Sequence, residues 1–177
     1  MPRNTWLKYL FVIFLFFIIG CSLEKSEQKG GYNMKLTSPA FNEGEKIPSE
    51  YTCDGEDINP ELIISDVPEN TKSLALIMDD PDAPMGIWVH WVIWDIQPGT
   101  IKISKGEKIT FPQGMTDFKK QEYGGPCPPS GTHRYFFKLY ALDIKLNLDS
   151  GANKKDLEKA MQGHILAQAQ LMGKYSR

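Results

Sequence analysis

Two stretches of the sequence place a proline-containing turn beside a histidine that begins an apolar segment. In the first, Asp80-Pro81-Asp82-Ala83-Pro84 is followed by His90-Trp91-Val92. In the second, residues 124–131 are rich in Gly and Pro and lead into His133-Arg134-Tyr135. Proline has no N–H for a sheet ladder, so each turn must lie at the end of a strand. The two stretches therefore predict a preformed polar pocket on a β scaffold.

Three segments have the composition of strands. Residues 74–78 are apolar without alternation, which predicts a strand buried on both faces. Residues 88–96 and 133–143 are rich in aromatic and β-branched side chains. Gly and Pro separate these short segments, and this pattern predicts a mainly antiparallel β-sandwich or barrel.

One helix is predicted near the C-terminus. Asn153 can cap it, with Asp156 three positions further on. Apolar residues then recur at helical spacing and continue past Gly163: Leu157, Met161, Ile165, Leu166, Ala169 and Met172.

The first twenty residues have the pattern of an export signal. Arg3 and Lys8 precede an apolar run at 9–19, which is shorter than the ~20 residues that a membrane-spanning helix needs. The run ends in Gly20-Cys21, which resembles a bacterial lipobox, in which the cysteine becomes the lipidated first residue. The alternative is an ordinary secretory signal with an incidental cysteine.

These features predict three regions. Residues 1–20 would be a signal peptide, 21–32 a lipidated Cys21 with a polar tether, and 33–177 one folded domain. A palmitate-bearing anchor would hold the protein on a membrane of the cell envelope, outside the cytoplasm. Ser22 is not an acidic retention signal, which is consistent with an outer membrane where the cell has one.

The charge balance argues against nucleic acid as a partner. Without residues 1–20 the chain loses Arg3 and Lys8, leaving 18 basic and 22 acidic residues and a net charge of −4. No basic run stands out. An anionic ligand would therefore be held by local geometry and not by a global field.

Strand alternation predicts which side chains accompany each histidine. His90 should share its face with Trp88, Val92 and Trp94, and His133 with Tyr135, Phe137 and Leu139. Asp80 is placed to accept an imidazole N–H, whereas Asp82 is expected to cap its turn by accepting a backbone N–H. Arg134 should face away in a surface ion pair, and His164 should be a structural residue of the final helix.

Residues 80–92 and 124–135 together resemble the phosphatidylethanolamine-binding protein family, most closely its bacterial Raf-kinase-inhibitor-like branch. Residues 51–60 and 163–175 fit the same branch, and the resemblance runs from Met34 to Tyr175. It implies a mainly β fold: an antiparallel β-sandwich of two packed sheets with peripheral helices, including a C-terminal helix.

The resemblance also implies a small pocket for phosphate-like anions, including a phosphoethanolamine head group. Carried over by position, its residues are Asp80, His90, Gly125, Pro129, His133 and Tyr135, with Tyr123 a looser candidate. The paired glycines at 124–125 permit close backbone approach to a ligand, and their N–H groups could form an anion-binding concavity. No cofactor or metal is expected.

We therefore expect a non-catalytic binding module. Because the family includes inhibitors of kinases and proteases, an envelope protein partner or protease is a further candidate. The alternative is a hydrolase or metal-dependent enzyme using Asp80, Asp82, His90 and His133. Against this reading, the chain has no Gly-x-Ser-x-Gly elbow and no His-Glu-x-x-His pair, and Ser130 has no evident base. A purely structural lipoprotein would leave the two histidine-bearing turns unexplained.

Two cysteines remain after Cys21. An even number in an exported domain is compatible with a Cys53–Cys127 disulfide. Cytoplasmic members of the family carry similar cysteines, so packing near the pocket is an equally open explanation.

Overall fold

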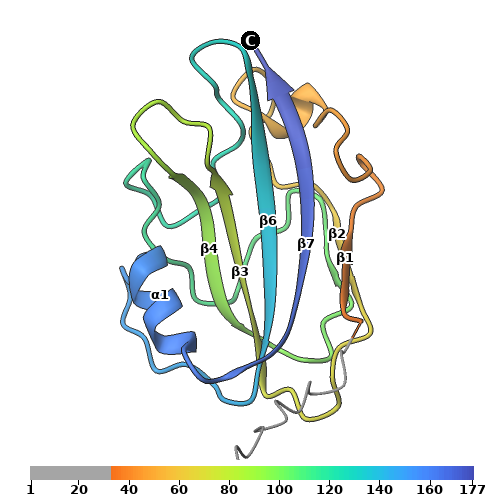
Figure 1. Ribbon diagram of the computed structural model, residues 1–177, viewed down its shortest axis with the longest axis vertical. Helices are drawn as coiled ribbons and strands as arrows, with labels where there is room; N and C mark the ends of the chain where they lie inside the picture. The colour runs from red at the N-terminus through yellow and green to blue at the C-terminus, as the bar shows by residue number, and fades with distance from the viewer. Residues whose placement is uncertain (1–32) are drawn as a thin grey trace, which may run out of the picture.

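The computed structural model describes residues 33–177, which form two antiparallel sheets and one α-helix (Figure 1). The smaller sheet has the order β1-β2-β5, from Lys35–Thr37, Leu62–Ser65 and Lys102–Ile103. The larger sheet has the order β4-β3-β6-β7, from Trp88–Ile96, Ser73–Asp80, Thr132–Leu142 and Ile165–Ser176. A 3₁₀ turn at Ser49–Tyr51 and helix α1 at Lys154–Met161 complete the fold. The predicted mainly β sandwich of two sheets is thereby confirmed.

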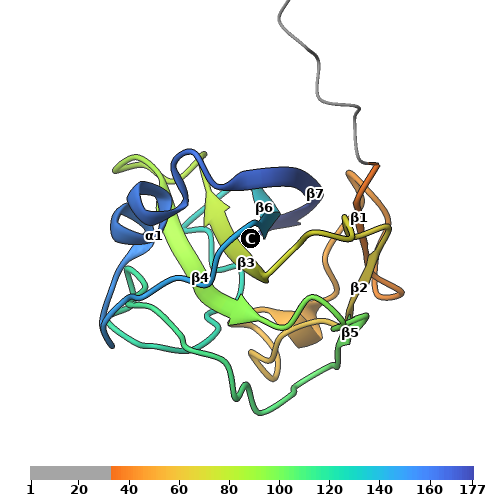
Figure 2. The ribbon, with the colours of Figure 1, turned by 90° about the horizontal axis from the view of Figure 1, so that it is seen from below.

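Strand β3 is buried along its whole length because apolar clusters cover both faces of the larger sheet. Leu76 and Met78 belong to the cluster between the two sheets. Ala75 and Ile77 belong to a second cluster, which α1 covers with Leu157. Figure 2 shows α1 and the smaller sheet on opposite sides of the larger sheet. The unbroken apolar run thus predicted this strand correctly.

The predicted helix begins as expected. The Asn153 side chain accepts N–H bonds from Lys155 and Asp156, and the Asp156 carboxylate accepts the Asn153 N–H. This reciprocal capping box fixes the first turn of α1.

The prediction that the helix continues past Gly163 is wrong. α1 ends at Met161, Gly163 adopts φ +80°, and the chain continues as β7 along β6. Residues 171, 173 and 175 are buried and their neighbours point outward, which is the period of a strand. His164 accordingly lies between the helix and β7, where its Nδ1 is 2.8 Å from Asp143 Oδ1.

No helix within residues 33–177 is long and apolar enough to cross a bilayer. The predicted signal peptide, the lipidated Cys21 and the tether lie outside the described residues.

Candidate ligand-binding pocket

A pocket of about 350 Å³ opens where β3 ends and where β4 and β6 begin. Because β3 is antiparallel to both neighbours, its last residue pairs with the first residue of β4 and lies close to the beginning of β6. This register brings together side chains that are far apart in sequence. Four of the six predicted site residues line the pocket: Asp80, His90, Pro129 and His133.

His133 is held by a carboxylate on the neighbouring strand. Its Nδ1 lies 2.7 Å from Asp80 Oδ2, and the two residues are only 7% and 3% exposed. The other oxygen of Asp80 accepts the Asp82 N–H at 2.8 Å, which holds the turn at Pro81. Since the ionised carboxylate is an acceptor only, His133 carries its proton on Nδ1. A neutral His133 ring therefore keeps Nε2 unprotonated.

Asp82 plays a different part from the one predicted. It accepts a backbone N–H, but from Arg134 on β6 at 3.0 Å and not from its own turn. The Arg134 guanidinium donates two further bonds, of 2.8 and 2.6 Å, to the same carboxylate. This hydrogen bonding lowers the pKa of Asp82 to about 2. The surface ion pair predicted for Arg134 is confirmed.

A β-bulge sets the direction of His90. Trp91 pairs with Met78 and Val89 with Asp79, so His90 is the extra residue of β4. Its ring lies 5.2 Å from that of Tyr135, in edge-to-face contact. The prediction that His90 shares its face with Val92 and Trp94 is therefore wrong, because those two residues pack in the cluster under α1. Trp88 does stay near His90, since both rings contact Phe118.

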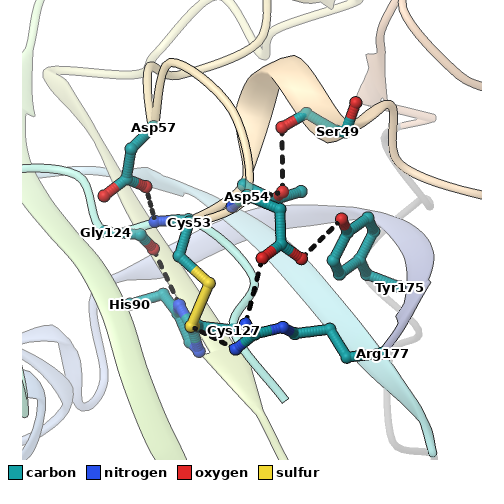
Figure 3. Close-up of a disulfide and its surroundings, with 11 residues drawn as sticks. Ser49, Cys53, Asp54, Asp57, His90, Gly124, Cys127, Tyr175 and Arg177 are labelled. Carbon is teal, nitrogen blue, oxygen red and sulfur yellow. Dashed lines mark hydrogen bonds and ion pairs between the residues drawn. A yellow bond between two sulfur atoms is a disulfide. The ribbon is translucent and has the colours of Figure 1, made fainter. Parts of the chain in front are cut away.

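The segment beginning at Gly124 is fastened to His90 at two points. The Gly124 N–H donates to the His90 carbonyl at 3.0 Å, and the Gly124 carbonyl lies 2.7 Å from His90 Nδ1 (Figure 3). A carbonyl can only accept, so Nδ1 of His90 must carry the proton. Burial lowers the pKa of His90, which is 2% exposed, and the Gly124 hydrogen bond only partly opposes this effect.

Tyr135 lies behind His90 and does not reach the lining of the pocket. It is fully buried, and within the described residues its hydroxyl has no hydrogen-bond partner. Burial raises the pKa of Tyr135, and the charge of Asp80 raises it further. The hydroxyl therefore stays protonated and remains an unused donor.

Gly125 and Tyr123 do not line the pocket. The Gly125 N–H donates to Asp57 Oδ1 at 2.7 Å, which corrects the expectation that it is free for an anion. A Cβ on Gly125 would lie 2.4 Å from the Tyr51 carbonyl oxygen, so the close approach is made by the protein's own chain. The Tyr123 hydroxyl donates to the same carbonyl at 2.8 Å.

A disulfide joins Cys53 to Cys127 beside the pocket, with the two Cα atoms 5.5 Å apart (Figure 3). Cys127 also lines the pocket. The Arg177 guanidinium lies against Cys127 Sγ at 3.5 Å and pairs with Asp54 at 3.1 Å. Asp54 in turn accepts the Tyr175 hydroxyl at 2.9 Å. These contacts tie the end of β7 to both halves of the disulfide.

Most of the remaining lining is apolar, and two of its residues, Met85 and Phe118, were missed from the sequence. The turn after Asp80 contributes Met85, which is 93% exposed, and β4 contributes Trp88. Phe118 lies over Trp88 and His90, with ring centroids 5.5 and 5.2 Å away. It comes from a loop with no strand-like pattern, so only its aromatic character could have singled it out. The pocket thus combines a small polar set with an apolar wall.

The sequence profile described as phosphatidylethanolamine-binding protein matches residues 37–176, and these residues include the whole pocket. The chain belongs to the phosphatidylethanolamine-binding protein family. Two relatives named UPF0098 protein are similar to it. The one from Methanothermobacter thermautotrophicus is 51% identical and the alignment covers 81% of this chain and 99% of the relative. The one from Aquifex aeolicus is 50% identical, with 84% and 91% covered.

Two crystal structures of phosphatidylethanolamine-binding protein homologues have the same fold. CT736 from Chlamydia trachomatis superposes with a TM-score of 0.80 at 43% identity, covering 83% of this chain and 99% of that one. YbcL from E. coli, described as a member of the mammalian family, gives 0.76 at 30%, with 81% and 98% covered. The matched region makes up almost the whole of each homologue, so we expect residues 33–177 to fold without the preceding residues.

Proposed function

We propose that this family member is an envelope lipoprotein whose domain is a non-catalytic binding module for a small oxyanion, either phosphate or a phosphate-containing head group. The observation that carries this proposal is the pair of buried rings, His90 and His133. Each has Nδ1 engaged by the protein and Nε2 available, and both line one pocket. When charged, each ring presents a donor and a positive charge.

Further features support binding in preference to catalysis. Within residues 33–177, Ser130 makes no hydrogen bond to a histidine, and Cys127 is held in the disulfide. Neither ring therefore has a hydroxyl or thiol that it could activate as a nucleophile.

Titration calorimetry on residues 33–177 tests the pocket. Phosphoethanolamine should bind more tightly at pH 5.5 than at pH 7.5, because protonation of a ring turns its Nε2 atom from an acceptor into a donor. His133→Ala should weaken binding, whereas His164→Ala, whose exposed ring pairs with Asp143, should not. Equal affinities for wild type and His133→Ala would remove this histidine from the proposed site.

The anchor needs a separate test, because Cys21 lies outside the described residues. Lipidation there would leave the polar tether between the membrane and the domain. Labelling of cells with a fatty-acid probe should mark the wild-type chain and not Cys21→Ala. A Cys21→Ala chain labelled like wild type would refute the anchor while leaving the pocket untouched.

Affinity capture from envelope extracts, wild type against His133→Ala, would then test for a protein partner that depends on the pocket.

A further inference from the structure

The two pocket histidines share one arrangement of protons. Nδ1 of His90 faces the Gly124 carbonyl and Nδ1 of His133 faces the Asp80 carboxylate, each at 2.7 Å. Both partners are acceptors, so both Nδ1 atoms are donors. Within the described residues, neither Nε2 has a hydrogen-bond partner. As long as the rings are neutral, the pocket therefore presents two acceptors where an oxyanion needs donors.

The charges around the rings reinforce this mismatch. Asp80 lines the pocket with a negative charge. Beside it, the positive charge of Arg134 balances the negative charge of Asp82. Asp79, on the other face of β3, is compensated by Lys138 and Lys154. The loop that carries Phe118 and the turn that carries Met85 bring apolar side chains, and Tyr135 is a neutral donor. No cation among residues 33–177 lines this pocket, so a fully ionised oxyanion gains no direct charge partner there.

We infer that at neutral pH this pocket selects oxyacids that bring their own proton, such as phosphonates and phosphomonoesters, over permanently deprotonated ones such as sulfonates and phosphodiesters. The inference rests on the proposed function and deepens it. The ligand's acidic O–H donates to the Nε2 of one ring, and its other oxygens remain acceptors. Sulfonates cannot offer that O–H near pH 7, so they need a protonated ring.

Three ligands with the same aminoethyl group separate these cases. They are 2-aminoethylphosphonate, phosphoethanolamine and 2-aminoethanesulfonate. The second pKa of the phosphonate is higher than that of the phosphate ester, which is about 6. At pH 7.0 the phosphonate should bind most tightly, the phosphate ester less tightly and the sulfonate most weakly. EDTA is present to exclude a metal ion between the two Nε2 atoms. The sulfonate should bind more weakly than the phosphonate by up to about tenfold, the effect of one hydrogen bond, because only the protonated fraction of the phosphonate carries the acidic O–H.

At pH 5.5 the difference in affinity between the phosphonate and the sulfonate should narrow, since a protonated ring can donate to all three ligands. Asp80→Asn should narrow it already at pH 7.0. That variant removes the negative charge, and its amide can donate to Nδ1 of His133, which moves the ring proton to Nε2.

Histidine nitrogen NMR of the unmodified domain tests the premise without any variant. His90 and His133 should both be in the Nδ1–H form at pH 7.0. An Nε2–H form of either ring, or equal affinity for sulfonate and phosphonate at pH 7.0, would overturn the inference and leave the proposed pocket standing. Absence of binding by all three ligands at both pH values would overturn the proposed function, and the inference with it.

Discussion

Asp79 and Asp80 are adjacent in β3, yet their carboxylates serve opposite faces of the larger sheet. Asp80 holds His133 in the pocket at 2.7 Å. Asp79 points to the side of α1, where Lys138 and Lys154 donate to it at 2.8 and 2.5 Å. Strand alternation separates the two side chains. One strand end thus anchors the helix on one face and positions the site on the other.

Replacing Asp79 should therefore lower stability without altering the pocket. The Asp79 side chain is 1% exposed, and Asp79→Asn would leave two ammonium groups without their counter-charge. We expect a loss of about 2 kcal/mol in the free energy of unfolding, below the range for fully buried pairs because Lys138 still reaches water.

Urea denaturation measures this loss, with Asp66→Asn as the matched control. Asp66 pairs with Lys35, but both side chains are more than half exposed. That variant should unfold like wild type, since solvent already screens the pair. Equal midpoints for the two variants would show that the Asp79 cluster contributes nothing.

The Asp82–Arg134 pair predicts a dependence on pH. The pKa of Asp82 is lowered from 3.8 to about 2, chiefly by its hydrogen bonds from Arg134. The carboxylate is therefore ionised in both folded and unfolded states above pH 4, and its stabilisation is fully present there. It is lost as the pH falls from about 4 to about 2. The pair is partly exposed, so solvent reduces the effect.

Carboxyl NMR titration checks this directly. In Arg134→Ala, the pKa of Asp82 should rise toward 3.8, and the difference in stability from wild type should shrink as the pH falls from about 4 to about 2. An unchanged pKa in the variant would assign the lowered value to other groups.

The sequence predicted the strands well and the end of the helix poorly. Residues 74–78 indicated a doubly buried strand, because they are apolar at every position. Residues after Gly163 were ambiguous: Leu166, Ala169 and Met172 are spaced by three, as on a helix. The strand period at 171, 173 and 175 was hidden, because its middle position is a glycine. Gly173 is required there because a Cβ would lie 2.5 Å from Ile47.

Four of the six predicted residues line the pocket, but the geometry of the site was not predicted. The bulge at His90 is one extra residue of β4 in its pairing with β3. Nothing in the local sequence indicates where this extra residue lies. The paired glycines predicted that a ligand could approach the backbone closely. What approaches Gly125 is Tyr51, more than seventy positions away, and such a partner is set by the tertiary fold alone.

Gly125→Ala should therefore destabilise the domain. The added methyl group would lie 2.4 Å from the Tyr51 carbonyl oxygen and 2.5 Å from Asp57 Oδ1. We expect a loss of about 2 kcal/mol, typical of overpacking. Gly99→Ala is the control, because nothing lies within 4 Å of its added Cβ. Thermal melts of both variants test this loss of stability. An unchanged melting temperature in Gly125→Ala would mean that the segment can move to fit the methyl group without losing stability.

The Cys53–Cys127 bridge should add substantially to stability. It links residues 74 positions apart, and chain-entropy reasoning gives about 4 kcal/mol for a loop of that length. Reduction should lower the denaturation midpoint of wild type. The double variant Cys53→Ser/Cys127→Ser should have the same denaturation midpoint as reduced wild type, and the reductant should not change that midpoint. The backbone bond from the Cys53 N–H to the Pro126 carbonyl, at 3.2 Å, does not depend on sulfur. We therefore expect the folded state and its pocket to survive reduction.

Alkylation of the denatured, unreduced domain followed by intact mass measurement tests the bridge itself, and two labelled thiols would rule it out.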